Sequence, residues 1–134
     1  MNKQETKVAY ISGPISGLQN GNSEAFFKAQ KDLEKQGYIV VNPHEIGKEL
    51  YNKWSTININ TKELVEESWQ DFMKNDIRHL TLCHVLFALE GWETSKGSKI
   101  EVYLANKLGI KIYSFKDFTE INIDLHLVPG RLLV

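Results

Sequence analysis

The stretch VAYISGPISG, residues 8–17, decides the fold, because it joins a short apolar run directly to a turn rich in glycine. An apolar run that is closed by turn residues is typical of a parallel strand that helices cover on both faces. We therefore expect a first strand over residues 8–11. The loop that follows this strand then lies at the carboxyl edge of the predicted sheet.

A helix and a second strand are predicted downstream of this loop. Asn22 or Ser23 is suited to cap a helix, and residues at helical spacing continue until Gly37, a common helix stop. Residues 38–41 form a second β-branched run, which ends at Asn42-Pro43 because proline cannot donate to a strand ladder. A strand, a helix and a second strand make a parallel crossover unit.

The same alternation continues along the chain. The sequence predicts a short helix over residues 45–54, a long helix capped by Thr61 and ending near Leu80, a strand over residues 82–89, a helix over residues 98–108 and a strand over residues 110–113. Residues 132–134 are a candidate fifth strand. The predicted fold over residues 1–134 is a single doubly wound α/β domain, flavodoxin-like or Rossmann-like, with a parallel sheet of four to five strands and helices on both faces. With strand order 2-1-3-4, a crevice lies at the carboxyl ends of the first and third strands.

Composition restricts the partners of the chain. The 134 residues are 42% hydrophobic and 25% charged, and 16 basic and 17 acidic side chains give a formal net charge of −1. The charges are mixed along the chain, so the sequence predicts no surface for long nucleic acid. No apolar stretch approaches the ~20 residues of a membrane span, and a polar run follows Met1. We expect a cytoplasmic protein that binds a small molecule and needs no cofactor or metal to fold.

Two loops at the predicted crevice contain candidate binding groups. The first loop consists of Ser12, Gly13, Pro14, Ile15, Ser16 and Gly17. Its glycines let backbone N–H groups approach an anion, although it matches neither common phosphate-loop motif and is equally well explained as a tight turn. The second loop, residues 91–97, precedes the helix that carries Glu101 in its first turn or so. The helix dipole alone favours a carboxylate at that position.

Asp76 and two tryptophans are further candidates. Asp76 falls within the otherwise apolar face of the long helix. Carboxylates are rarely buried unless paired, so Asp76 is expected to pair with the backbone, with His79 or Arg78, or with a ligand. Trp92, in the second loop, is a better ligand candidate than Trp69, whose helical spacing is typical of a core residue.

The cysteine and the histidines of the sequence do not indicate a metal site or a reactive thiol. Cys83 is the one cysteine and stands within an apolar run, which favours core packing. His44 is expected to be a capping or surface residue, and His84, inside a predicted strand, a core residue. None of the four histidines has the spacing of a metal ligand, so no metal is expected.

In this order and context, the motifs resemble the nucleoside 2-deoxyribosyltransferase superfamily. The resemblance is to its short DUF4406-like members, which are related to deoxynucleoside 5′-monophosphate N-glycosidases, and it covers most of residues 7–114. It is carried by residues 10–17, 41–43 and 75–77, and by Gly91-Trp92 with Ser95-x-Gly97-x-x-x-Glu101. The resemblance implies a homodimer or a larger homo-oligomer.

The resemblance also implies a role for each matching residue. Glu101 matches the family nucleophile, which attacks the anomeric carbon of deoxyribose, and Tyr10 matches the tyrosine that orients this carboxylate. Asp76 matches the aspartate that contacts the base and helps to manage its proton. Gly97 matches a glycine that lines the sugar site, and Ser95 stands where monophosphate hydrolases have serine and transferases of free nucleosides have aspartate.

The implied activity is cleavage or transfer of the N-glycosidic bond of a deoxynucleoside 5′-monophosphate or a deoxynucleoside, through a covalent deoxyribosyl-glutamate intermediate. Deoxyribose lacks the 2′-hydroxyl, so an oxocarbenium-like transition state is accessible and a carboxylate can capture it. We expect monophosphates to be preferred, because Ser95 can donate to a phosphate and Lys96 adds a positive charge.

Two other functions remain open. The first is a catalytically inactive module of the same fold that binds or senses nucleotides, because fold alone does not fix function. A flavin-binding protein is the second and is less favoured, because the first loop lacks a run of hydroxyl residues. His84 stands where an aspartate is common in the family, so no role is carried over to that position.

Overall fold

The computed structural model of this chain describes residues 5–123. Its strands are β1 (Val8–Ser12), β2 (Ile39–Val41), β3 (Val85–Ala88) and β4 (Lys111–Ser114). They form one parallel sheet in the order β2-β1-β3-β4, in which Tyr10 of β1 is paired with Val41 on one side and Leu86 on the other. The predicted strand order is confirmed. Residues 132–134, the candidate fifth strand, lie outside the described residues.

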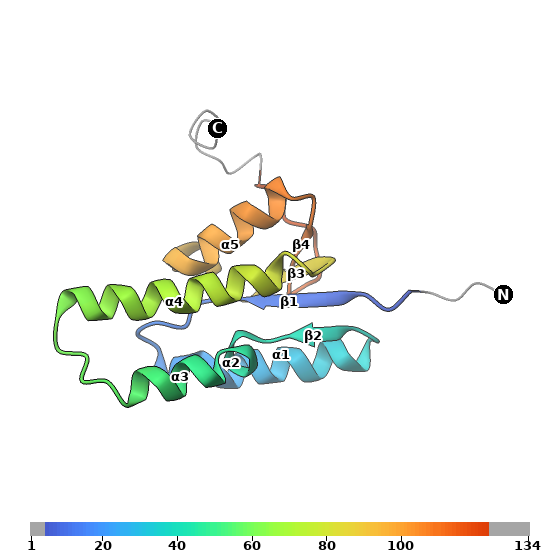
Figure 1. The fold of residues 1–134 in the computed structure, drawn as a ribbon. Coiled ribbons are helices and arrows are strands. Elements are labelled where there is room, and N and C mark those ends of the chain that lie inside the picture. Colours follow the sequence, from blue (N-terminus) through green and yellow to red (C-terminus); the bar gives the residue numbers. More distant parts are fainter. Residues whose placement is uncertain (1–4, 124–134) are drawn as a thin grey trace.

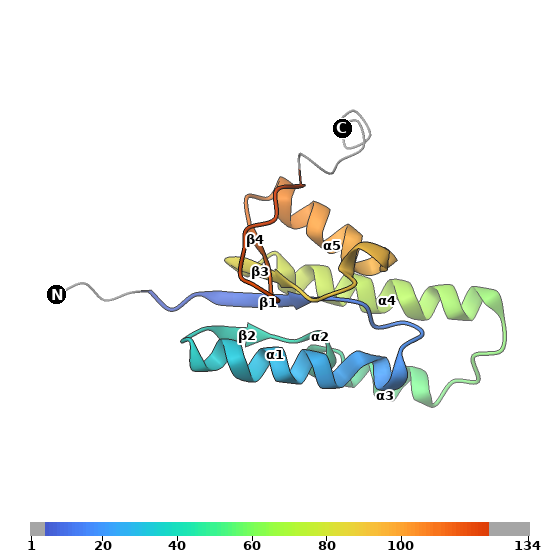
Figure 2. The same cartoon turned by 180° about the vertical axis from the view of Figure 1, so that it is seen from behind.

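Helices cover both faces of this sheet, as Figures 1 and 2 show. Helix α1 (Ser23–Lys35) packs on one face, and α4 (Lys62–Leu80) and α5 (Lys96–Lys107) pack on the other. Two short helices, α2 (Pro43–Ile46) and α3 (Lys48–Ser55), follow β2. The doubly wound α/β class predicted from the sequence is therefore confirmed.

The core consists of two layers, because successive strand residues point to opposite faces. Tyr10 and Leu86 pack with Leu80 and Val102 beneath α4 and α5. The neighbouring strand residues pack against α1; they include Ala9, Ile11 and Phe87. Even-numbered positions of β1 therefore face α4 and α5, and this orients Ser12 as well as Tyr10.

Local signals set several helix boundaries as expected. The Thr61 hydroxyl accepts a hydrogen bond from the Leu64 N–H (3.1 Å) and caps α4. The Asn42 side chain accepts from the His44 N–H (2.9 Å), with Pro43 at the first position of α2. Gly37 has a φ of +98°, the left-handed conformation that ends α1.

Other boundaries differ from the sequence-based expectation. The strand predicted over residues 82–89 is shorter, because residues 81 and 82 form a turn that leaves Leu82 77% exposed. His84 is exposed and precedes β3, where its Nδ1 accepts from the Val8 N–H (2.9 Å); its prediction as a core histidine is wrong. The helix predicted over residues 45–54 is divided at Gly47, where a Cβ would lie 2.9 Å from the Pro43 carbonyl oxygen.

The start of α1 also differs from the expected cap. Asn22 precedes α1 with a φ of +62° and makes no side-chain cap. Its Nδ2 donates instead to the Pro14 carbonyl (3.0 Å), which ties the start of α1 to the loop that follows β1. Asn20 and Gly21 also have positive φ values, so three consecutive left-handed residues form this turn.

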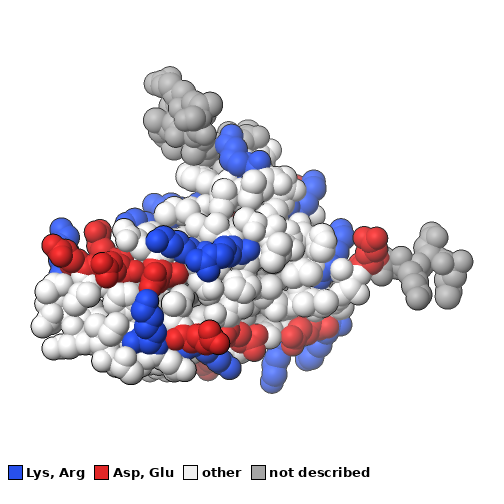
Figure 3. Space-filling view, viewed as in Figure 1, with Lys and Arg blue, Asp and Glu red and all other residues white. Residues whose placement is uncertain are grey.

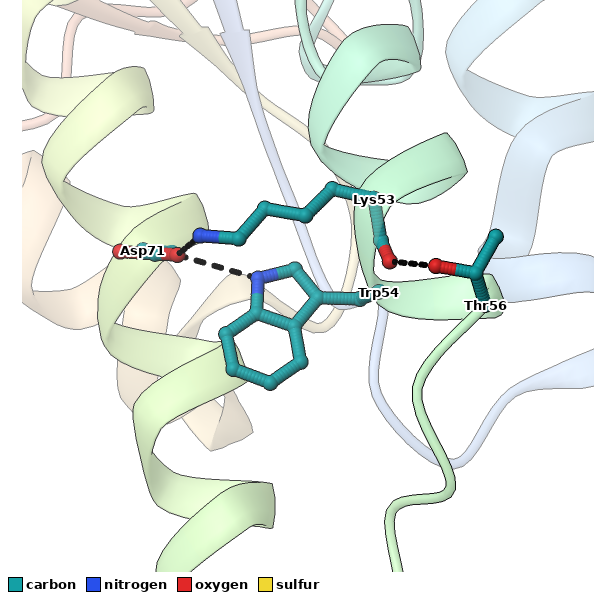
Figure 4. A network of polar contacts seen from close by, with 4 residues as sticks. All are labelled: Lys53, Trp54, Thr56 and Asp71. Atoms are coloured by element: carbon teal, nitrogen blue, oxygen red, sulfur yellow. Dashed lines mark hydrogen bonds and ion pairs between the residues drawn. The ribbon is translucent and has the colours of Figure 1, made fainter.

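Helices α3 and α4 extend beyond the carboxyl end of β1 and are joined there by residues 56–61, as Figure 1 shows. Asp71 of α4 holds them together, because its Oδ2 accepts from Lys53 Nζ and from Trp54 Nε1, both at 3.0 Å (Figure 4). The Thr56 hydroxyl donates to the Lys53 carbonyl (2.8 Å) at the end of α3. We call the contact of Asp71 with Lys53 and Trp54 the α3–α4 clamp.

Acidic and basic side chains are interspersed on the face shown in Figure 3, which presents no broad basic area. Within residues 5–123, no helix combines the length and the apolar character that crossing a membrane requires.

Candidate active site

A cavity of about 1100 Å³ lies beside the loop that follows β1, and α3, α4 and the start of α5 form its other walls. This volume is near the upper end of the range for small-molecule sites. Both acidic side chains that line the cavity, Asp76 and Glu101, are buried. The predicted site residues that line it are Gly13, Pro14, Ile15, Ser16, Asp76, Ser95, Gly97 and Glu101.

Glu101 is held by two hydroxyl groups from β1. Its Oε2 accepts from the Tyr10 hydroxyl (3.0 Å), and its Oε1 accepts from the Ser12 hydroxyl (2.6 Å). Only 5% of Glu101 is exposed, and both donors are fully buried. Tyr10 and Ser12 point to the same face of β1, so one strand fixes both oxygens of the carboxylate. The interaction expected from the sequence between Tyr10 and Glu101 is present.

The position of Glu101 on its helix is later than expected. Helix α5 begins at Lys96, two residues before the predicted start, so Glu101 is the sixth residue and lies in the second turn. The effect of the helix dipole is largely confined to the first turn. The dipole therefore does not explain why a carboxylate is buried there.

Burial raises the pKa of Glu101 to about 7, although the hydrogen bonds from Ser12 and Tyr10 favour the charged form. Burial, and next the nearby charge of Glu101, raise the pKa of Tyr10 well above its usual range. Tyr10 consequently keeps its proton and remains a donor to Glu101.

Asp76 lies on α4, is 6% exposed and contributes to the same cavity. Its Oδ1 is buried with no hydrogen-bond partner in residues 5–123. None of the pairings expected with Arg78, His79 or the backbone forms there, and His79 Nδ1 instead contacts the Asn75 carbonyl (2.9 Å). Asp76 is thus a buried carboxyl group whose remaining candidate partner is a ligand.

The two carboxyl groups differ in their electrostatic environment. Burial, and next the charge of Glu101, raise the pKa of Asp76 to about 8. Glu101 has a hydroxyl donor on each oxygen, whereas Asp76 Oδ1 has none. When the pair holds one proton, the hydroxyl donors therefore favour the negative charge on Glu101 and the proton on Asp76.

Two glycines let the walls of the cavity approach each other. A Cβ on Gly13 would lie 2.8 Å from Leu89 Cβ, so the loop after β1 packs closely on the end of β3. A Cβ on Gly97 would lie 3.1 Å from Met73 Sδ, so the start of α5 packs closely on α4. This second contact brings the helices that carry Asp76 and Glu101 together.

Four predicted site residues do not line the cavity. Tyr10 and Ser12 contact Glu101 and not the cavity, and Gly17, in a left-handed conformation (φ +81°), is not part of the cavity wall. Trp92 packs against the hydrophobic core, because the chain turns at Gly91 (φ +89°) into a short 3₁₀ segment. The prediction of Trp92 as a substrate-binding residue therefore finds no support in the geometry.

Trp69, predicted to be a core residue, lines the cavity instead. The Lys96 ammonium lies 4.4 Å from the centroid of the Trp69 ring, which is consistent with a cation–π contact. Trp69 lies seven residues before Asp76, so it shares the side of α4 that faces the cavity. The Trp69 ring is therefore available to stack on a planar ligand in the cavity.

Ser95 has a structural role in addition to its place in the cavity wall. Its hydroxyl oxygen accepts from the Ser98 N–H (3.2 Å) and caps α5. The hydroxyl hydrogen is not used in this contact and remains available to a ligand. Lys96, the next residue, is exposed at the same rim.

Two further residues belong to the site and were not predicted there. Ser98 is 2% exposed, and its hydroxyl lies 2.6 Å from that of Ser12. His44 is half-buried, lines the cavity and contacts the Gly21 carbonyl through Nε2 (2.9 Å), while burial lowers its pKa. Ser98 precedes Glu101 by three positions, which places both on one side of α5, so this spacing could have indicated Ser98 from the sequence. No local signal indicates His44.

Cys83 does not line the cavity, and the described residues of the site do not form a metal-binding group. Cys83 is buried, donates to the His79 carbonyl (3.3 Å), and burial raises its pKa to about 11, so it is a core residue as predicted. Residues 5–123 contain no group of three or more histidine, cysteine, aspartate or glutamate side chains that could hold a metal ion.

The fold and the site together define a class: an α/β domain with a buried pair of carboxyl groups in a cavity at the carboxyl edge of its sheet. Residues 7–114 match the family described as Domain of unknown function (DUF4406), and the chain belongs to this family. A comparison with curated proteins finds no match.

Solved structures include a match to a 2-deoxyribosyltransferase from the psychrotolerant bacterium Bacillus psychrosaccharolyticus, described as a biocatalyst for the synthesis of antiviral and antitumoral nucleosides. The TM-score is 0.55 at 19% identity, and the match covers 88% of this chain and 79% of that chain. The resemblance to nucleoside 2-deoxyribosyltransferases is thus confirmed at the level of the fold.

Proposed function

We propose that this chain cleaves or transfers the N-glycosidic bond of a deoxynucleoside 5′-monophosphate or a deoxynucleoside, with Glu101 as the nucleophile. One observation carries the proposal. The buried Glu101 carboxylate accepts a hydroxyl hydrogen on each oxygen and lines the same cavity as Asp76, whose Oδ1 has no partner in the described structure. Two carboxyl groups that share a site but hold different protonation states are the groups that glycosidic cleavage requires.

In the first step, a Glu101 oxygen attacks C1′ of deoxyribose. The bond from C1′ to the base nitrogen breaks, and its electron pair stays with the base. Asp76, which holds the shared proton, donates it to the departing base. The products of this step are the free base, a deoxyribosyl ester of Glu101 and an ionised Asp76.

In the second step, water attacks C1′ and the ester bond to Glu101 breaks. The Asp76 carboxylate takes the proton from water, which restores both side chains to their starting states. A second base in place of water gives transfer instead of hydrolysis. Tyr10 and Ser12 hold the carboxylate in the orientation that both steps need.

The alternative function is a nucleotide-binding module without turnover. Such a module needs a cavity and groups that recognise the ligand, but it gains nothing from burying two carboxyl groups with raised pKa values. Burial of ionisable groups is costly and is concentrated at catalytic sites. The acidic pair therefore favours the enzyme over the binding module.

The test is to incubate the protein with a panel of deoxynucleosides and their 5′-monophosphates, with and without acceptor bases, and to measure the release of free base. Glu101→Gln should lower turnover at least about a hundredfold with little change in Tm, because it removes a transition-state interaction. The matched control is Glu90→Gln, on an exposed residue after β3. Near-normal turnover by folded Glu101→Gln would refute the mechanism, and tight binding without base release by the wild type would establish the binding module.

We further propose that the 5′-phosphate of the preferred substrate lies at the rim formed by Ser95 and Lys96. The free hydroxyl hydrogen of Ser95, the ammonium of Lys96 and the start of α5 all favour an anion there. A charge-assisted hydrogen bond typically contributes ~1.5–3 kcal/mol, so kcat/KM should favour the monophosphate by about tenfold or more.

Ser95→Asp separates the phosphate contact from the helix cap. Aspartate caps helices as well as serine does, so Tm should hold while the negative charge repels the phosphate and the preference disappears or inverts. Ser95→Asn is the matched control, since it keeps a cap without adding charge. Equal kcat/KM values for the wild type on a nucleoside and its monophosphate would contradict the phosphate site.

A further inference from the structure

Ser98 and Glu101, which line the cavity, and Ser12, which does not, form a continuous chain of hydrogen bonds. The hydroxyl oxygens of Ser98 and Ser12 lie 2.6 Å apart, and the Ser12 hydroxyl lies 2.6 Å from Glu101 Oε1. Ser98 is 2% exposed and Ser12 is 1% exposed. The chain runs from α5 to β1 and returns to α5 at Glu101, and all three side chains are buried.

The direction of this chain follows from the number of hydrogens. A hydroxyl group has one hydrogen, and an ionised carboxylate has none to give. When Glu101 is ionised, the Ser12 hydrogen is used in the contact with Oε1, so the hydrogen between the two serines belongs to Ser98. Ser98 therefore donates to Ser12, and Ser12 donates to Glu101.

The helix cap does not account for the Ser98 side chain. The cap uses the backbone N–H of Ser98, which donates to the Ser95 hydroxyl oxygen. An alanine at position 98 keeps that N–H and changes the volume little. The hydroxyl is buried, which is unfavourable unless it is hydrogen-bonded, and its partner is the Ser12 hydroxyl.

We propose that Ser98 is a positioning residue that polarises the Ser12 hydroxyl and thereby stabilises the ionised form of Glu101. A donor that itself accepts a hydrogen bond becomes a stronger donor, and this effect is greatest in a low-dielectric site with a charged acceptor. The catalytic consequence rests on the proposed function of Glu101 as nucleophile. The effect of Ser98 on the ionisation of Glu101 rests on the hydrogen bonds alone.

Two other titratable groups face Glu101. Tyr10 donates to Oε2 from β1, and Asp76 lies across the cavity on α4. Both have raised pKa values and are neutral while Glu101 ionises, so neither reverses the direction of the hydroxyl chain. Removal of the Ser98 hydroxyl should therefore change the pKa of Glu101 in one direction, upward.

The experiment is to titrate the Glu101 carboxyl carbon by ¹³C NMR in full-length wild type, Ser98→Ala and Ser98→Thr, with Glu101→Gln to assign the signal. Ser98→Ala should raise the pKa of Glu101 by about 0.5 pH unit, and threonine, which keeps the hydroxyl, should restore it. On a substrate that is turned over, the acidic limb of kcat/KM should move by the same amount. Ala105→Gly, in the buried part of α5, is the control; it should lower Tm without moving the pKa.

A double-mutant cycle tests the order of the chain. Ser12→Ala should raise the pKa of Glu101 at least as much as Ser98→Ala does, and Ser98→Ala should add nothing in the Ser12→Ala background. If Ser98→Ala fails to fold, Ser98→Cys, which weakens the donor at similar volume, takes its place. An unchanged pKa of Glu101 in folded Ser98→Ala or Ser98→Cys, or an additive effect in the cycle, would overturn the proposal. Because NMR needs no substrate, a wild type without turnover refutes the proposed function and leaves this result intact.

Discussion

The cavity has two ends that are built differently. At the inner end, Asp76 and Glu101 are 6% and 5% exposed, and buried hydroxyl groups fix Glu101. At the outer end, Tyr51 of α3 and Val65 of α4 are 68% and 55% exposed. The outer wall is held in place by the α3–α4 clamp.

Under the proposed function, this difference separates chemistry from recognition. A carboxylate that must reach one carbon atom needs a fixed orientation, which buried hydrogen bonds from β1 provide. An exposed apolar wall contacts whatever part of the ligand extends from the reacting centre. Substitutions at the inner end should therefore change kcat and its pH dependence, whereas substitutions at the outer end should change KM.

The largest effect is expected from Asp76→Asn, which removes the proposed proton donor at the inner end. The turnover number should fall about a hundredfold or more, in line with the loss of a general acid. In the wild type, kcat/KM should rise with pH as Glu101 ionises, near its pKa of about 7, and fall as Asp76 loses its proton, near its pKa of about 8. Asp76→Asn should lose the alkaline limb, which a pH–rate series measures directly.

Asp76→Asn should also stabilise the fold. The folded pKa of Asp76 is raised above its unfolded value of about 3.9, so its favourable contribution is complete below that value and is lost as pH rises toward about 8. At pH 8, thermal unfolding should show a higher Tm for Asp76→Asn than for the wild type, and the difference should shrink at pH 5. An unchanged Tm at both pH values would mean that ionisation of Asp76 does not destabilise the folded state.

A smaller effect is expected from Trp69→Ala, between the two ends of the cavity. Stacking of a base on an aromatic ring contributes ~1–3 kcal/mol, so KM should rise about tenfold with little change in kcat. Trp92→Phe is the matched control, since Trp92 packs against the core and not on the cavity. The measurement is steady-state kinetics. A rise in KM for Trp92→Phe and not for Trp69→Ala would support the sequence-based expectation and contradict the structure.

The fold was predictable because its signals are local. The glycine-rich turn after β1, Pro43 after β2 and the apolar periodicity of α4 each set a boundary within a few residues. The failures occurred at local turns that the apolar pattern does not reveal. Gly47, with φ −93° and ψ 3°, separates α2 from α3, and a turn at residues 81 and 82 shortens β3.

The site was predictable in part, for a related reason. The strand order places the ends of β1 and β3 together, and with them Tyr10 and the start of α5. Side-chain direction is not given by strand order. For that reason Ser98 was not predicted as a site residue. Trp69 was expected in the core but lines the cavity, and Trp92 was expected at the ligand but packs against the core. The homo-oligomer implied by the family resemblance stays a prediction, which sedimentation can test.

The smallest effect is expected from Asp71→Ala, which opens the α3–α4 clamp at the outer end (Figure 4). Hydrogen bonds from Lys53 and Trp54 lower the pKa of Asp71, so its contribution to stability is present above the unfolded value of about 3.9 and is lost as pH falls. Because α3 would then pack less firmly on α4, KM at neutral pH should rise up to about threefold with kcat unchanged. The matched control is Asp32→Ala, which breaks the exposed pair of Asp32 with Lys28 on α1, away from the cavity, and should leave KM as it is. A fall in kcat for Asp71→Ala, or equal effects of the two variants on KM, would show that the two ends of the cavity do not act separately.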